Sequence, residues 1–150
     1  MKKIPLKGKY GNGKEILIDD EDFDSLSSHS WYANHEGRPL SCINYKNTYL
    51  PRFLLNPPKN MEVDHINGDI LDNRRGNLRL ATRQQNERNK KPKLGRFKGI
   101  SKRNDKWRAL IKVDGKHVYL GTHATPDAAA LAYNEGAMKY FGEFAGLNPI

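Results

Sequence analysis

A hairpin signature in the C-terminal third of the chain constrains its fold most. Residues 107–113 alternate between apolar and polar side chains, Asp114-Gly115 follows, and residues 116–121 return as a second strand. Asp-Gly is typical of the two-residue type I′ turn, in which both central residues have positive φ. Together with the residues before it, the pattern predicts a three-stranded antiparallel meander over 96–122.

A two-residue loop also fixes the register of this hairpin, and directly opposed residues share a face. The expected pairs are Lys112 with His117, Ile111 with Val118, Leu110 with Tyr119, and Ala109 with Leu120. One face is then apolar, with Trp107, Ala109, Ile111, Val118 and Leu120. The opposite face is basic with one aromatic ring, and holds Arg108, Leu110, Lys112, His117 and Tyr119. Such a face is either a solvated surface or one that enters the major groove of DNA.

A helix is predicted to follow the meander. Thr125-Pro126-Asp127 places an N-cap, a proline at the first helical position and an acid in the first turn. Gly142 is expected to end this helix, because glycine is common just after the last helical residue. The residues that recur at helical spacing are Ala129, Ala132, Tyr133, Ala137 and Tyr140. We expect the small alanines to let this helix lie close on the apolar face of the sheet.

Composition indicates a polyanionic partner. The 150 residues carry a formal net charge of +9, and phosphates neutralised by Lys or Arg release condensed counterions. Hydrophobic residues make up 37%, which argues against one large core. The single cysteine, Cys42, excludes a disulfide framework and a zinc site built on paired cysteines. With no signal peptide or membrane-spanning segment in the sequence, a cytosolic location (bacterial or phage-infected host cytoplasm) is expected, with no membrane partner and no small-molecule substrate.

The first 60 residues are predicted to be a β-rich support region. Strands are expected at 15–18, 31–33, 40–43 and 48–50, with a short helix around Phe23 and Leu26. Pro57-Pro58 ends the region with an extended break. A basic stretch at 87–96 contains Pro92 and Gly95, and its part 91–96 is predicted to be a linker along a phosphate backbone.

The central segment, residues 61–90, contains the residues that we expect to act in catalysis. Asp64 and His65 stand directly before the turn-forming Ile66-Asn67-Gly68, and residues 77–81 make a plausible second strand. Thr82 and Gln85 match a capping box, which predicts a helix from about Arg83. This strand, loop, strand and helix could bring Asp64, His65 and Asn86 together.

These residue types suit hydrolysis of a phosphodiester bond. The Asp64 carboxylate and the Asn86 carbonyl are hard oxygen ligands, suited to one divalent metal ion, Mg²⁺. His65 could deprotonate the attacking water, because an imidazole titrates near neutral pH. A lone Asp-His pair before a turn is more often structural, so the order of all three residues carries the hypothesis.

This segment resembles the HNH homing endonucleases of bacteriophages and bacteria. The matching stretches are 63–69, 72–79 and 85–89. The resemblance implies a ββα-metal motif at 61–90, with His65 as general base and with Asp64 and Asn86 as metal ligands. It also implies that Asn77 is the middle asparagine, which braces the loop. The chain lacks the cysteine pairs of the zinc-stapled members, so packing must hold the motif.

The C-terminal segment resembles the AP2 DNA-binding domain, best known from plant transcription factors. The matching stretches are 97–100, 106–109, 119–122, 128–133 and 147–148. By position the resemblance implies duplex-DNA contacts from Lys98, Ser101, Arg103, Arg108, Lys112, His117 and Tyr119. Three of these positions, 98, 101 and 117, carry an arginine in the family, so the target sequence cannot be transferred.

The sequence therefore predicts an α+β protein: a ββα-metal (HNH) nuclease motif plus a small three-stranded antiparallel sheet packed on one helix, which is AP2-like at 97–150. The function expected is that of a site-targeted, metal-dependent endonuclease acting on double-stranded DNA. One alternative is a non-catalytic DNA-binding protein or regulator with a relic nuclease motif. A weaker one is an RNA-binding protein, for which no single-strand stacking platform is visible.

Overall fold

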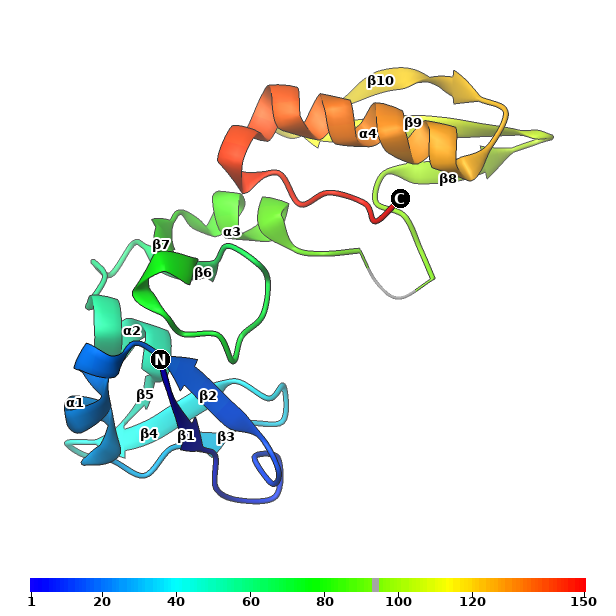
Figure 1. Ribbon diagram of the computed structural model, residues 1–150. Helices are drawn as coiled ribbons and strands as arrows, with labels where there is room; N and C mark the ends of the chain where they lie inside the picture. The colour runs from blue at the N-terminus through cyan, green and yellow to red at the C-terminus, as the bar shows by residue number, and fades with distance from the viewer. Residues whose placement is uncertain (93–94) are drawn as a thin grey trace. The chain divides into compact units, whose positions relative to one another are not determined.

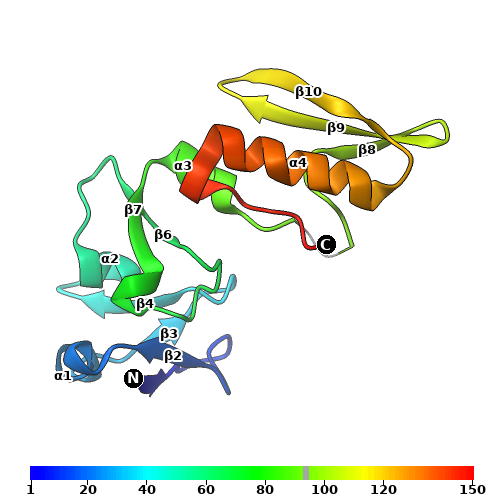
Figure 2. The same cartoon turned by 45° about the horizontal axis from the view of Figure 1, so that its top comes forward.

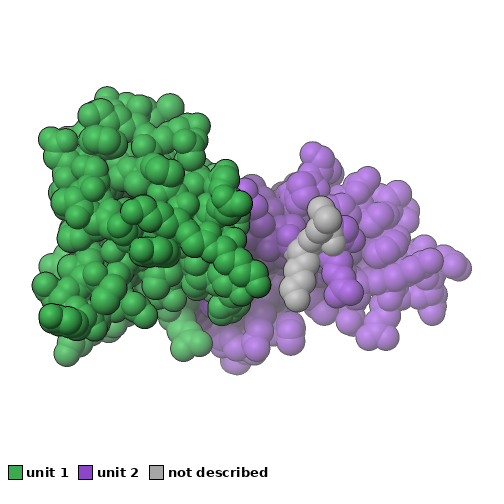
Figure 3. All heavy atoms as spheres, turned by 90° about the horizontal axis from the view of Figure 1, so that it is seen from below, with its two compact units in different colours: residues 1–83 green, residues 84–150 purple. Residues whose placement is uncertain are grey.

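The computed structural model describes residues 1–92 and 95–150, and it divides into two compact units, Met1–Arg83 and Gln84–Ile150 (Figure 3). The division falls at the start of the helix α3 (Arg83–Asn89). Residues 93 and 94 of the expected linker 91–96 lie outside the described residues. Within the described residues, no helix combines the length and the apolar character needed to cross a membrane.

The first unit is built from three small antiparallel sheets and two short helices (Figure 1). The sheets are β1–β2, β3–β4–β5 and β6–β7. The elements are β1 (Lys2–Pro5), β2 (Glu15–Ile18), α1 (Phe23–Ser27), β3 (Tyr32–Ala33), β4 (Pro39–Ile43), β5 (Lys46–Tyr49), α2 (Leu50–Leu55), β6 (Glu62–His65) and β7 (Leu78–Ala81). Short 3-10 turns precede α1 at Asp20–Asp22 and β7 at Arg75–Asn77.

Most elements predicted in the first 60 residues are confirmed, but β1 and α2 were not predicted. The strand expected at 48–50 ends at Tyr49, because Leu50 opens α2. Pro51 sits in the first turn of this helix, where its missing N–H costs nothing. Asn56 closes the helix in the left-handed region, at φ 41°. These two signals at its ends account for a six-residue helix that the spacing of hydrophobic residues did not predict.

The core of the first unit lies between β1, β2, α1 and α2. Ile16 and Ile18 alternate along β2 toward the interior and are fully buried. Trp31 is also buried, and its indole N–H donates to the Leu26 carbonyl oxygen at 2.8 Å. The core residues are Ile4, Leu6, Ile16, Ile18, Leu26, Trp31 and Leu50.

In the second unit, three strands form a sheet in the order β10–β9–β8, with β8 (Ile100–Arg103), β9 (Lys106–Val113) and β10 (Lys116–His123). The type I′ turn is confirmed, since Asp114 and Gly115 have φ values of 47° and 84°. Three predicted pairs are confirmed, Lys112 with His117, Ile111 with Val118 and Leu110 with Tyr119. The fourth is wrong: a β-bulge follows Tyr119, so Ala109 pairs with Gly121 and not with Leu120.

The helix α4 (Pro126–Phe141) packs against this sheet in both views of the ribbon (Figures 1 and 2). Thr125 caps it, its hydroxyl oxygen accepting from the Ala128 N–H at 3.2 Å. The helix comes close to the sheet at Gly136, where an added Cβ would lie 2.7 Å from Leu120 Cδ1. Tyr140 was expected on the buried face, but it is 38% exposed. A 3-10 turn at Gly142–Phe144 follows the helix.

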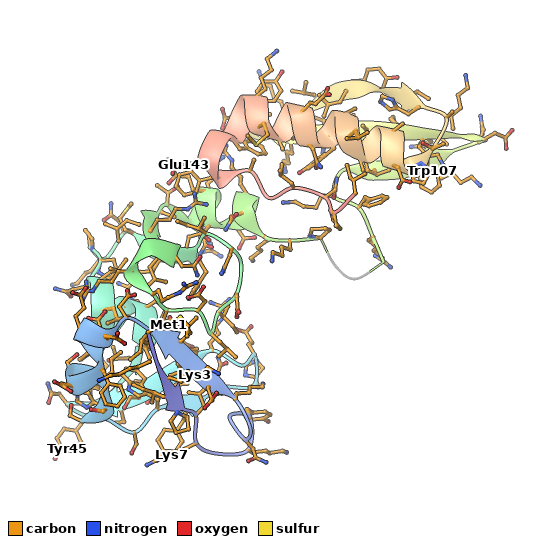
Figure 4. The ribbon with its side chains drawn as sticks, in the orientation of Figure 1. Met1, Lys3, Lys7, Tyr45, Trp107 and Glu143 are labelled. Atoms are coloured by element: carbon orange, nitrogen blue, oxygen red, sulfur yellow. The ribbon has the colours of Figure 1, made fainter. Side chains whose placement is uncertain are left out.

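The buried positions of α4 and β9 meet in the core of the second unit. Ala129, Ala137, Ala109 and Ile111 are buried, as the register and the helical spacing predicted. Trp107, labelled in Figure 4, is only half-buried near the start of β9. The whole chain is thus a mixed helix and sheet protein with small antiparallel sheets, which confirms the predicted α+β class.

Candidate active site

The hairpin of β6 and β7 carries the residues that the sequence singled out. Asp64 lies opposite Arg79, and His65 lies opposite Leu78 at the end of β6. The predicted turn follows directly, because the Gly68 N–H donates to the His65 carbonyl oxygen at 2.9 Å and Gly68 has φ 73°. Asp64 is 4% exposed, whereas His65 is half-buried.

Asp64 is paired with a residue that the sequence reasoning did not single out. Arg79 Nε donates to Asp64 Oδ2 at 2.9 Å, and its Nη2 lies 2.7 Å from the same oxygen. The opposed positions on the two strands account for the pairing, since cross-strand neighbours share a face. The guanidinium gives this buried carboxylate a cationic partner at hydrogen-bond distance.

Asn77 ties together the loop between the two strands. Its Oδ1 accepts from the Asn67 backbone N–H at 3.0 Å. Its Nδ2 donates to Asn67 Oδ1 at 3.0 Å and to the Asp72 carbonyl oxygen at 2.7 Å. The Asn77 carbonyl oxygen also accepts from the Ile66 N–H at 2.9 Å. Asn77 is 8% exposed, so these bonds brace the segment that follows His65.

His65 contacts a second residue absent from the predicted site. Its Nε2 lies 3.2 Å from Oδ1 of Asn73, a fully buried side chain. Burial lowers the pKa of His65, although the hydrogen bond with Asn73 and nearby carboxylates act in the opposite direction. The imidazole is therefore held toward its neutral form, the form that accepts a proton. An asparagine inside a polar loop gives no sequence signal that separates it from an ordinary turn residue.

The first 60 residues hold this loop in place. The Leu17 N–H donates to the Leu71 carbonyl oxygen, and the Asn73 N–H donates to the Leu17 carbonyl oxygen, both at 2.8 Å. The Arg75 guanidinium binds the carboxylate of Asp22, with Nη2 to Oδ1 at 2.7 Å and Nε to Oδ2 at 2.9 Å. The Asp22 side chain is buried, so this ion pair sits in a protected setting.

Asn86 lies on α3, which belongs to the second unit apart from its first residue, and it is half-buried. The structure thus places Asp64, His65 and Asn77 around one hairpin, while the approach of Asn86 to them stays a prediction. The helix itself starts at Arg83, as the capping-box pattern predicted.

The donor set fits a hard divalent cation in chemical type. Asp64 offers a carboxylate and Asn86 an amide carbonyl, and both are hard oxygen donors. Among the described residues, no group of three or more His, Cys, Asp or Glu side chains could hold a metal ion. A site with one carboxylate and one amide is compatible with that result, because Mg²⁺ keeps several waters and needs few protein ligands.

The residues expected to contact DNA lie mostly on one face of the second unit's sheet. Ser101 pairs with Arg108 across β8 and β9, and Lys112 pairs with His117 across β9 and β10. By strand alternation this face is opposite the one that Ala109 and Ile111 turn toward α4. Its exposed members are Arg103, Lys112, His117 and Tyr119. Ser101 and Arg108 are half-buried.

Lys98, which is predicted to contact DNA, binds backbone carbonyl groups of its own unit. Its Nζ donates to the carbonyl oxygens of Arg88 at 2.8 Å and of Lys90 at 2.7 Å, at the end of α3. A cation there satisfies carbonyl groups that a helix end leaves without partners. Burial lowers the pKa of Lys98. This lysine is engaged within the protein, and its contact with DNA stays a prediction.

Comparison with known proteins agrees with the geometry of the β6–β7 hairpin. A family described as HNH endonuclease matches residues 56–88. An uncharacterized HNH endonuclease of Acanthamoeba polyphaga mimivirus is 32% identical over 147 residues, which cover 93% of this chain and 78% of that protein. No solved structure matches the chain. With its hairpin of Asp64 and His65 inside the matched segment, the chain belongs to the HNH endonuclease family.

Proposed function

We propose that this endonuclease is a metal-dependent, site-targeted enzyme of the homing type, which hydrolyses phosphodiester bonds in double-stranded DNA. The observation that carries the proposal is that a buried carboxylate with a guanidinium partner and a half-buried imidazole are neighbours at the end of one strand. Asp64 is buried against Arg79, and burial lowers the pKa of the neighbouring His65. A carboxylate can serve as a metal ligand, and an imidazole with a lowered pKa can serve as a general base.

His65 would act on the attacking water. In the neutral form its imidazole takes a proton from the water as the water attacks phosphorus, and the bond to the leaving 3′ oxygen then breaks. Asn77 keeps the segment after His65 in one conformation through its bonds to Asn67 and Asp72. Asp64 and Asn86 would hold the ion, Mg²⁺, which when bound neutralises charge on the scissile phosphate and on the leaving oxygen.

The second unit would bind the duplex. Its sheet resembles the AP2 domain, and the face opposite α4 offers cationic and aromatic side chains at Arg103, Arg108, Lys112, His117 and Tyr119, with Ser101 beside them. Arg108 Nε is buried and has no hydrogen-bond partner among the described residues, so a bound phosphate or base could supply one. An AP2-like module joined to an HNH nuclease is a homing-endonuclease arrangement, which favours a site-targeted enzyme.

Cleavage of supercoiled plasmid carrying the DNA that flanks the protein's own gene tests the catalytic proposal. With Mg²⁺ the wild type should nick or cut, and His65→Ala should lower the rate by a factor on the order of 10² to 10⁴. His35→Ala is the matched control, because His35 is an exposed histidine of the same unit. Equal cleavage by wild type and His65→Ala would refute the general-base role. Binding without cleavage by the wild type would favour a DNA-binding protein with a relic motif.

Salt dependence tests the role of the sheet. In the full chain, Lys112→Ala should weaken duplex binding and reduce the slope of log K against log salt by about 1. Lys139→Ala, on α4, is a control of the same charge and should leave the slope unchanged. Identical slopes for both variants would rule out a phosphate contact at Lys112.

A further inference from the structure

Asn73 is the buried polar residue that the proposed mechanism leaves without a role. Its side chain is fully buried and uses both ends of its amide. Nδ2 donates to the Ile70 carbonyl oxygen at 3.1 Å, and Oδ1 lies 3.2 Å from His65 Nε2. A carbonyl oxygen can only accept, so the bond to Ile70 fixes which end of the amide is the NH₂. The oxygen of Asn73 must therefore face the histidine.

This arrangement determines the tautomer of His65. Because Asn73 Oδ1 has no hydrogen to donate, the hydrogen of their shared bond belongs to His65 Nε2. A neutral imidazole carries one N–H only, so Nδ1 is then the unprotonated, basic nitrogen. When Nδ1 takes up a proton, Nε2 keeps its N–H and the Asn73 oxygen continues to accept it. The same hydrogen bond therefore serves the imidazole before and after proton transfer.

The backbone of Asn73 is held by the N-terminal region. Its N–H donates to the Leu17 carbonyl oxygen, while the Leu17 N–H donates to the Leu71 carbonyl oxygen, both at 2.8 Å. Both polar groups of Leu17 thus point toward the loop, although Leu17 lies opposite Lys3 in the β1–β2 ladder. Its neighbours Ile16 and Ile18 are fully buried. A strand anchored in the core therefore positions the residue that touches His65.

We propose that Asn73 is a positioning residue that fixes the Nε2–H tautomer and the ring orientation of His65, and that β2 holds Asn73 in place through Leu17. The first 60 residues then contribute to catalysis by setting the direction in which the general base presents Nδ1. The proposal rests on the proposed role of His65, but the state of the ring can be observed without any reaction.

The first test is NMR of ¹⁵N-histidine-labelled full-length protein at neutral pH, without DNA or metal. The wild type should show His65 protonated at Nε2 and unprotonated at Nδ1, with a slowly exchanging Nε2 hydrogen. Asn73→Leu should speed that exchange roughly tenfold or more, whereas Asn73→Asp retains an acceptor for the Nε2 hydrogen and should keep its exchange slow. Arg74→Ala is the loop control, since Arg74 binds Asp72 and not His65. A wild-type ring protonated at Nδ1, or a ring signal unchanged in Asn73→Leu, would overturn the proposal.

Hydrogen exchange of backbone amides tests the link to β2. The wild-type amide hydrogens of Leu17 and Asn73 should both be protected, and rapid exchange at Asn73 would refute the contribution of β2. In single-turnover cleavage at saturating enzyme, Asn73→Leu should be slower by roughly 10- to 100-fold with unchanged DNA affinity. A wild type that does not cleave would refute the proposed function, while the NMR result would still decide the role of Asn73.

Discussion

Removing the Asn77 side chain should destabilise the first unit by an amount that the structure allows us to work out. The amide makes hydrogen bonds of 3.0, 3.0 and 2.7 Å to Asn67 and to the Asp72 carbonyl oxygen. Each contributes about 1 kcal/mol net, and a buried group left without a partner costs about 1–3 kcal/mol. Water can enter at this loop and recover part of that cost. We expect Asn77→Ala to lower the free energy of unfolding by about 2–4 kcal/mol.

Thermal unfolding followed by Trp31 fluorescence measures this loss. Trp31 is buried in the first unit, and Trp107→Phe removes the fluorescence of the other tryptophan. Since 1 kcal/mol corresponds to about 4–8 °C in a unit of this size, a loss of about 2–4 kcal/mol should lower the Tm by roughly 8–32 °C. Asn47→Ala, at an exposed position on β5, should change stability by less than about 0.5 kcal/mol. If Asn77→Ala behaves like Asn47→Ala, the loop is not held by this residue.

Four further substitutions test the packing and the electrostatics. Gly99→Ala should cost the second unit about 2–4 kcal/mol, because φ is +68° and the added Cβ would overlap a β9 carbonyl oxygen and an α4 ring. Gly115→Ala has open space and should cost only about 1 kcal/mol, as measured by circular dichroism on heating. Thr125→Ala should lose about 1 kcal/mol with the cap of α4, again by Tm. The hydrogen bond from Arg74 lowers the pKa of Asp72 from its ordinary value of 3.8. The ionised Asp72 carboxylate therefore stabilises the fold when the pH is above 3.8, and this contribution is lost as the pH falls through the lower pKa of the folded state. Arg74→Ala should flatten the acid-side decline of Tm, and an unchanged decline would contradict the pairing.

Local rules predicted the parts of the fold that local geometry decides. Asp114-Gly115 fixed a turn, the turn fixed three cross-strand pairs, and Thr125-Pro126 fixed the start of α4. The prediction failed one pair later, where the bulge after Tyr119 shifts the register. A bulge depends on how the strand must twist to cover the helix, and alternation of side chains does not encode that.

Such local rules could not predict contacts between residues that are distant in the sequence. Asn73 meets Leu17 across 56 positions, and its contact with His65 depends on how the whole loop closes. From the sequence, it could equally have been a turn residue exposed to water. The contact between Arg79 and Asp64 was easier to predict, because Arg79 lies opposite Asp64 once the two strands are paired in register. The sequence was sufficient to single out Asp64 and His65, but not the side chains of Arg79 and Asn73 that contact them.

Lys98 has a structural role that its place in a basic stretch did not predict. A lysine in a basic stretch is expected to bind phosphate. The Lys98 ammonium group also binds the carbonyl oxygens of Arg88 and Lys90. The Gly146 N–H also donates to the Arg88 carbonyl oxygen at 3.1 Å, and the Arg88 guanidinium lies 4.4 Å from the centre of the Phe141 ring. The end of α3 is therefore anchored within the second unit, in a stretch expected to begin the linker. It follows that Asn86, two positions before Arg88, stands on a helix that the rest of the second unit helps to hold.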